Sequence, residues 1–374
     1  MIIKAFITHK QAELFADCQD RFGVNPDTKS ISVSDGMGST WQQKIWAQLL
    51  VEAYTQSDTW VPSIESIKPL CSSWQSQVEA FIQHLKDTNA PLNMVYRNER
   101  NLAEGRSAGA TFVGIRFNGY KWTSTVLGDS CLIEWNGTEA KFHTSQDVEA
   151  FDSYPDYFDS DASKEGKGTP KDINGVISVG KFLFLVSDPF SEFLLEHSKQ
   201  GNIGQYIEEL LALTSHDGFE ALVNDWRKEG MHNDDTTLVI VEYDNSKVLT
   251  INHEDNIVKM VEEERVIQES NKKTIEVGSI GTPNAPSAMR QAIDKQGENP
   301  ISEDPRNDSH DFVNADTIVE EFLVEYKKAL AGRCQRKPKR DVKKFLGKLQ
   351  YKTTQDAAKD ALNTILNKYV IYVK

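Results

Sequence analysis

The chain has few of the features that build disulfide frameworks, zinc sites or membrane spans. Its four cysteines are scattered, with no Cys-x-x-Cys pair and no histidine at zinc-finger spacing, which argues against a disulfide scaffold and a structural zinc site. No apolar run approaches the length of a membrane span, and the first residues lack the long apolar stretch of a signal peptide. No G-x-G-x-x-G loop supports a dinucleotide-binding fold. We therefore expect a cytoplasmic protein with no membrane partner.

Aromatic residues are also missing from one long stretch. No Phe, Trp or Tyr lies between Tyr243 and Phe312, where four of the twelve prolines fall. Such a stretch supplies little core and is typical of a solvated linker. Apolar residues then return at helical spacing, which predicts a small bundle of short helices. The predicted organisation is a folded domain at 1–253, a partly disordered linker at 254–315 that begins with a helix around 257–268, and a helical C-terminal module at 316–374.

Positive charge is scarce outside that last module. The whole chain carries a net charge of −14, which would repel a phosphate backbone and makes nucleic acid an unlikely partner. Residues 316–374 depart from this balance, with 14 Lys and Arg against 7 Asp and Glu. The basic module is predicted to dock an acidic or phosphorylated partner, or the acidic main domain, and a solvated helix face is the alternative.

Strand and helix patterns alternate within residues 1–253. Apolar spacing predicts an amphipathic helix around 74–85. The pairs Asn118-Gly119 and Asn136-Gly137 lie between strand patterns and predict hairpins with type I′ turns. The domain closes on a predicted strand pair at 238–241 and 248–251. Consecutive hairpins flanked by helices indicate an α+β fold with antiparallel sheets.

Four acidic segments, each predicted to end a strand, carry the functional signal. A single Asp before Gly is usually only a turn former. Four carboxylates from distant parts of the chain, delivered by rigid strands, instead match the oxygen ligands that hard divalent cations prefer. We interpret them as one metal cluster. The segments are VSDG at Asp35, LGDS at Asp129, VSD at Asp188 and NDD at Asp234.

The order of these segments resembles the PP2C class of metal-dependent protein phosphatases over residues 1 to about 245. Two further motifs contribute to the resemblance, CQD ending at Asp20 and SAGAT ending at Thr111. The resemblance implies an α-β-β-α sandwich, in which two antiparallel sheets are flanked by helices, with two Mg²⁺ or Mn²⁺ ions at one end. It further implies hydrolysis of phosphoserine and phosphothreonine in proteins by water activated between the ions. The implied substrate is a phosphorylated protein, such as a cognate Ser/Thr kinase or the target of that kinase.

The resemblance also implies roles for individual residues. Asp35 would bridge the two ions, the backbone carbonyl of Gly36 would join the second ion, and Asp188 and Asp234 would hold the first. Asp35, Asp188 and Asp234 would thus be catalytic through the water that the ions bind, while Asp20 would act through such a water. Two further carboxylates are candidates for a third, weaker ion: Asp129 and Glu192.

Some positions depart from the PP2C pattern. Met37 stands where many eukaryotic members carry a histidine that donates a proton, and Pro189 replaces the glycine of an SDG motif. The arginine that grips phosphate is also absent, and the cationic candidates to replace it are His9, Lys10 and Arg21. These departures keep an alternative open, a catalytically weak or inactive pseudophosphatase that acts as a binding or regulatory module.

Overall fold

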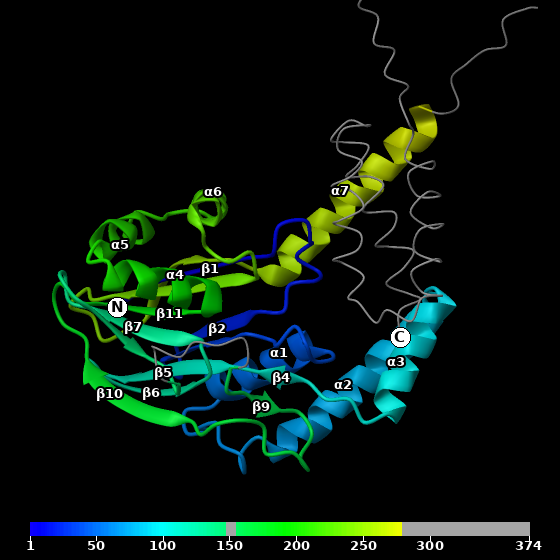
Figure 1. Ribbon diagram of the computed structural model, residues 1–374, viewed down its shortest axis with the longest axis horizontal. Coiled ribbons are helices and arrows are strands. Elements are labelled where there is room, and N and C mark those ends of the chain that lie inside the picture. The colour runs from blue at the N-terminus through cyan, green and yellow to red at the C-terminus, as the bar shows by residue number, and fades with distance from the viewer. Residues whose placement is uncertain (147–154, 279–374) are drawn as a thin grey trace, which may run out of the picture. The chain divides into compact units, whose positions relative to one another are not determined.

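The described part of the chain is a sandwich of two β-sheets with helices on both outer faces (Figure 1). The computed structural model describes residues 1–146 and 155–278, which belong to the first of two compact units, Met1–Asn284. The predicted helical module at 316–374 and the remainder of the predicted linker lie outside the described residues.

The larger sheet has six strands and the smaller sheet has five. In spatial order, the six are β13 (Thr250–Glu254), β1 (Ile2–Thr8), β12 (Thr236–Glu242), β11 (Phe182–Val186), β7 (Cys131–Trp135) and β8 (Ala140–His143). The five are β10 (Lys171–Val176), β6 (Lys121–Leu127), β5 (Phe112–Asn118), β3 (Ser30–Ser34) and β2 (Arg21–Asn25). Two short strands form a separate ladder, β4 (Gly109–Ala110) and β9 (Phe158–Asp159).

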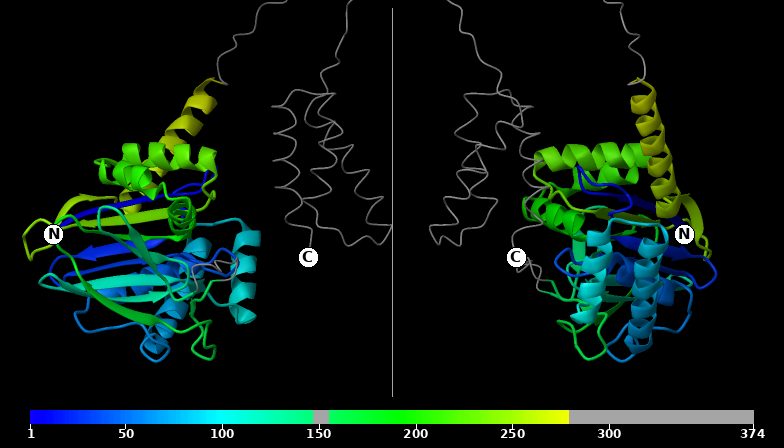
Figure 2. Two further views of the ribbon diagram at one scale, coloured as in Figure 1. Left: turned by 60° about the vertical axis from the view of Figure 1, so that its left-hand side comes forward. Right: turned by 90° about the vertical axis from the view of Figure 1, so that its right-hand side faces the viewer.

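Helices cover the outer face of each sheet, as the two views of Figure 2 also show. The larger sheet packs against α4 (Asp188–Lys199), α5 (Ile203–Leu211) and α6 (His216–Glu229). The smaller sheet packs against α1 (Gln43–Thr55) and α2 (Lys68–Asp87). The remaining described helices are α3 (Leu92–Ala103), which contacts α2, and α7 (Ile257–Gly278).

The buried apolar side chains form three layers, because successive residues of a strand point to opposite faces of its sheet. In β11, Leu183 and Leu185 point into the layer between the sheets, whereas Phe184 and Val186 point toward α4, α5 and α6. A run that is apolar at every position is what a strand buried on both faces requires. The predicted α-β-β-α sandwich of antiparallel sheets is therefore confirmed for the described residues.

One pairing differs from the prediction. The strands predicted at 238–241 and 248–251 exist, but β12 and β13 do not pair with each other, because β1 lies between them. β13 runs parallel to β1, with a register shift between Ile3 and Lys4, and it is the parallel exception in an otherwise antiparallel sheet. The helix predicted at the start of the linker is α7, which extends to Gly278.

Both predicted hairpins are present, with different turns from those expected. In the first, Asn118 pairs with Lys121, so the two loop residues are Gly119 and Tyr120. Gly119 has a φ of 63° and Tyr120 is not among the residues with positive φ, a pattern that fits a type II′ turn and not type I′. In the second, Asn136 uses its side chain to accept hydrogen bonds from the backbone of the following turn.

Candidate metal centre

The predicted acidic residues line one open cavity at the end of the sandwich. The cavity has a volume of about 600 Å³, and we call it the acidic cavity. Six residues predicted as metal ligands line it: Asp35, Gly36, Asp129, Asp188, Glu192 and Asp234. The structure therefore brings together carboxylates that are spread over two hundred positions of sequence.

The turn after β3 positions Asp35. Its backbone N–H donates to Oγ1 of Thr111 at 3.2 Å, and its carbonyl oxygen accepts from the Thr111 N–H at 2.9 Å. Thr111 is itself tied to Ser130 through their hydroxyl groups. A Cβ on Gly36 would lie 2.9 Å from Cγ of Gln43 and 3.0 Å from the carbonyl oxygen of Gln19. Only glycine fits there, which leaves the Gly36 backbone beside the cavity.

Asp20 lies below the cavity and is fully buried. Its Oδ2 accepts a hydrogen bond from Oγ1 of Thr237 at 2.8 Å. No backbone or side-chain N–H of the described residues donates to its Oδ1, and the carboxyl groups of Asp20 and Asp35 lie close enough to share a proton. A buried carboxylate oxygen without a donor costs free energy, and a nearby cation or its bound water would offset that cost.

Asp188 is the first residue of α4, directly after β11. Pro189 occupies the first turn of that helix, where its fixed φ and missing N–H cost nothing. The proline in place of glycine therefore starts the helix without disturbing the position of Asp188. Ser191 holds the same turn by donating to the carbonyl oxygens of Asp129 and Asp188.

Asp234 does not end a strand, contrary to the prediction. It follows α6 and lies two residues before β12, so the loop between them positions it. Arg227 of α6 fixes this loop by donating to the carbonyl oxygens of Asp234 and His9 at 2.7 and 3.1 Å. The local pattern of small and acidic residues predicts a turn at Asp234, but it does not indicate whether the neighbouring strand precedes or follows that turn. In the structure, β12 follows it.

Asp235 has a structural role that the sequence did not predict. Its Oδ1 accepts from the backbone N–H of Lys10 at 3.0 Å, and its Oδ2 accepts from that of Gln19 at 2.7 Å. Asp235 thus binds both ends of the single loop that connects β1 to β2. The NDD segment marked this position as acidic. The sequence alone does not show which of the two adjacent aspartates binds a metal and which binds the backbone.

Mutual repulsion and burial dominate the electrostatics of the site. Burial, with added repulsion from Asp129 and Asp234, raises the pKa of Asp35 to about 7. Burial is also the largest cause that raises the pKa of Asp188, followed by the charges of Asp35 and Asp129. The pKa of Asp20 is raised in the same way, by burial and then by Asp35. A group of carboxylates that disfavours its own ionisation is a site that cations stabilise.

Of the three cationic candidates, Lys10 contacts the acidic group. Its Nζ lies 2.7 Å from Oδ1 of Asp234. Burial lowers the pKa of Lys10, but the hydrogen bond and the charge of Asp234 outweigh burial and raise it. The guanidinium of Arg21 instead donates to the carbonyl oxygens of Cys18 and Asp20.

His9 also has partners of its own. Its Nδ1 lies 2.7 Å from the carbonyl oxygen of Lys10, and its Nε2 lies 3.6 Å from Oε1 of Glu264 on α7. The ring meets Phe15 edge to face. These contacts direct His9 toward α7.

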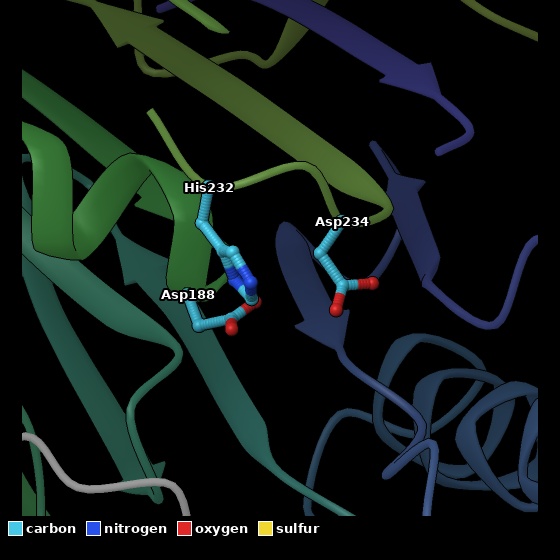
Figure 3. A group of neighbouring side chains, drawn as sticks. All are labelled: Asp188, His232 and Asp234. Atoms are coloured by element: carbon cyan, nitrogen blue, oxygen red, sulfur yellow. The ribbon is translucent and has the colours of Figure 1, made fainter. Parts of the chain in front are cut away.

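His232 is an additional side chain at the cavity. Its place beside Asn233 and Asp234 in the sequence favours an ordinary loop histidine, with a supporting role at the metal site as the alternative. In the structure, one ligand atom each from Asp188, His232 and Asp234 lies within 4.8 Å of the others. Figure 3 shows the imidazole of His232 directed toward the Asp188 carboxylate.

No protein-family model and no curated protein matches the chain. Among solved structures, it is similar to a bacterial serine phosphatase, at 13% identity and a TM-score of 0.42 over 65% of this chain and 99% of that chain. It is also similar to the serine/threonine phosphatase Stp1 from Staphylococcus aureus, at 12% identity and a TM-score of 0.43 over 65% of this chain and 95% of that chain. A third is the serine/threonine phosphatase PstP/Ppp from Mycobacterium tuberculosis, at 15% identity and a TM-score of 0.39 over 64% of this chain and 96% of that chain. At such identities the likeness concerns the fold, and the function has to come from the residues of this chain.

Proposed function

We propose that the chain is a PP2C-like protein phosphatase that hydrolyses phosphoserine and phosphothreonine esters with divalent cations as cofactors. One observation carries the proposal, the convergence of Asp35, Asp188 and Asp234 from three separate segments on one open cavity. Fully buried Asp20 adds a fourth carboxylate beneath them.

The donor set fits Mg²⁺ or Mn²⁺. Carboxylate and carbonyl oxygens are the ligands that these hard cations take in proteins. Oδ1 of Asp20, to which no N–H group of the described residues donates, is an oxygen that a hydrated cation would satisfy. Two ions would be held by Asp35, the Gly36 carbonyl, Asp188 and Asp234, with Asp20 acting through water. When bound, the ions supply charge neutralisation for a phosphate dianion and acidify the attacking water.

The proposal includes a third ion, bound at the cavity by Asp129 and Glu192. Asp129 and Glu192 both line the cavity. Burial is the largest cause that raises the pKa of Glu192, while the nearby His232 charge lowers it. A site built from two carboxylates, one of them on the exposed side of α4, would hold an ion more weakly than the central group does.

Lys10 is the residue that we assign to the phosphate of the substrate. Its ammonium group contacts Asp234, which is one of the residues that line the cavity. An ammonium group is a point charge that binds phosphate oxygens without the forked geometry of arginine. Lys10 would hold the phosphoryl group against the ions, and His9 and Arg21 would not contact it.

The partners follow from this activity. The substrate would be a phosphorylated protein, with a cognate Ser/Thr kinase or its target as the candidate, and the basic module at 316–374 would dock an acidic surface. Within the part of the chain that the structure describes, no helix has the length and apolar content needed to cross a membrane. A cytoplasmic location is consistent with these features and is proposed on that basis.

A second candidate is a pseudophosphatase that binds phosphoproteins without hydrolysing them. The contact between Lys10 and Asp234 favours it, because an ammonium group that neutralises a ligand carboxylate partly replaces a cation. The enzyme remains our proposal because a single ammonium group leaves Asp20, Asp35 and Asp188 unneutralised.

Assays of the full chain separate the two candidates. After treatment with EDTA, the chain should hydrolyse p-nitrophenyl phosphate and a phosphothreonine peptide only when Mn²⁺ or Mg²⁺ is added. Asp35→Asn and Asp234→Asn should abolish the activity, because each removes a charged ligand. Asp225→Asn, which changes an exposed aspartate of α6 paired with Lys228, is the matched control and should keep it. Absence of metal-stimulated turnover on both substrates would favour the pseudophosphatase.

A further inference from the structure

His232 offers a nitrogen donor in a cavity whose other donors are oxygens. Its ring, Asp188 and Asp234 can each place one ligand atom within 4.8 Å of the other two (Figure 3). Among the described residues, the imidazole forms no side-chain hydrogen bond, and it is exposed to the cavity that it lines. An ion at the ring would therefore break no side-chain hydrogen bond, and the ring also lies near Glu192, whose pKa a charge on His232 lowers.

The loop that carries His232 is anchored on both sides. α6 ends at Glu229 and is capped by Gly230, whose φ is 119°. The Met231 N–H donates to the carbonyl oxygen of Trp226 at 2.9 Å. The buried Met231 side chain packs in the core. On the other side, the Asp234 N–H donates to the carbonyl oxygen of His232 at 3.1 Å. Because the loop backbone is fixed, the imidazole is presented from a defined position.

We infer that His232 is a nitrogen ligand of the ion held by Asp188 and Asp234, and that this ligand makes the position prefer first-row transition ions over Mg²⁺. The inference deepens the proposed function and rests on it. Imidazole suits transition ions, whereas Mg²⁺ demands oxygen ligands in near-ideal octahedral geometry and keeps several waters. A mixed set of two carboxylates and one imidazole thus favours ions such as Mn²⁺.

The buried carboxylate beneath the site supports a bound cation independently of His232. Oδ1 of Asp20 is buried and no N–H group of the described residues donates to it, while the neighbouring carboxyl group of Asp35 offers no donor once both groups are ionised. Asp20 also contributes to the raised pKa of Asp188, which places the two carboxylates within electrostatic range of each other. An unsatisfied acceptor of this kind points to a cation or its hydration shell above it.

Spectroscopy of bound Mn²⁺ tests the inference without measuring activity. In the full chain, electron spin echo modulation should show a directly bound imidazole nitrogen in the wild type and lose it in His232→Ala. His84→Ala is the matched control, since His84 is exposed on α2, and it should keep the signal. Competition titrations should show the preference for Mn²⁺ over Mg²⁺ falling about tenfold in His232→Ala, or about 1.4 kcal/mol, and staying unchanged in His84→Ala.

The outcomes distinguish this inference from the proposed function. If Mn²⁺ binds but the wild type lacks the nitrogen signal, His232 is not a ligand, although the metal centre is supported. The same conclusion follows if His232→Ala keeps both the nitrogen signal and the preference for Mn²⁺. If neither Mn²⁺ nor Mg²⁺ binds the wild type, the proposed function and the inference fall together.

Discussion

Neighbouring aspartates have different roles at the residue scale. Asp234 faces the acidic cavity and the Lys10 ammonium group, whereas Asp235 uses both carboxylate oxygens on backbone N–H groups. The sequence predicted Asp234 as a ligand through a family resemblance, but spacing alone does not show which carboxylate binds the backbone. That choice depends on the N–H groups of Lys10 and Gln19, which come from a distant part of the chain.

Lys10 carries a prediction at the same scale. Lys10→Ala should raise the KM for a phosphothreonine peptide by about tenfold, which corresponds to about 1.4 kcal/mol of lost phosphate binding. Lys10→Arg should restore most of the loss because it keeps the charge. Steady-state kinetics with Mn²⁺ measure both variants.

The control is Lys228→Ala, which removes an exposed lysine of α6 and should leave KM unchanged. A wild-type KM in Lys10→Ala would show that this ammonium group does not contact the substrate.

At the element scale, the turns between strands set the geometry of the cavity. The turn that joins β6 to β7 contains Gly128 and Asp129. Gly128 has a φ of 96°, and a Cβ at this position would lie 2.6 Å from the carbonyl oxygen of Asp156 and 2.7 Å from Cγ2 of Thr111. Thr111 holds the Asp35 turn, so this close packing connects two acidic turns.

Gly128→Ala is therefore expected to destabilise the fold by about 2 kcal/mol or more, through positive φ and the clash with backbone. Urea denaturation measures the loss. Gly105→Ala is a control with a positive φ and no atom within 4 Å of its Cβ, so it should cost less, about 1 kcal/mol. Equal losses in the two variants would contradict the role of close packing at Gly128.

A second prediction at this scale concerns the junction of α6, β1 and β13. Nδ1 of His216 lies 2.9 Å from Oδ2 of Asp255, which also accepts from the Ile7 N–H. The hydrogen bond to Asp255 raises the pKa of His216 above its usual value, while burial opposes the shift. The pair therefore stabilises the fold fully below about pH 6.5, and its contribution is lost as the pH rises through the higher folded-state value.

The stability lost in His216→Ala should accordingly be larger at about pH 5.5 than at about pH 9. Urea denaturation of wild type and variant at both values measures this difference. His84→Ala, which removes an exposed histidine, should show little change between the two. A loss in His216→Ala that does not depend on pH would contradict the charged pair.

At the scale of the whole molecule, the sequence predicted the layers better than the pairing. Alternation and Asn-Gly pairs predicted the hairpins that contain β5 with β6 and β7 with β8, because both signals are local. The parallel pairing of β13 with β1 joins residues about 250 positions apart. Local sequence patterns do not predict a pairing over such a separation. The position of His232 beside Asp188 likewise depends on the antiparallel pairing of β11 with β12, which brings the start of α4 and the loop before β12 to the same end of the larger sheet.

The charge of the molecule links the acidic cavity to the stability of the fold. The chain carries a net charge of −14, and part of that charge is concentrated at the acidic cavity, where burial and neighbouring carboxylates raise the pKa values of Asp20, Asp35 and Asp188. Such repulsion destabilises the folded state unless cations bind. Metal binding is thus expected to contribute to stability as well as to catalysis.

The most direct test of the metal centre is anomalous X-ray diffraction from crystals of the full chain equilibrated with Mn²⁺. We expect at least one anomalous peak within coordination distance of Asp35, Asp188 and Asp234, and no such peak in crystals of Asp35→Asn. An acidic cavity without anomalous density at saturating Mn²⁺ would contradict this expectation.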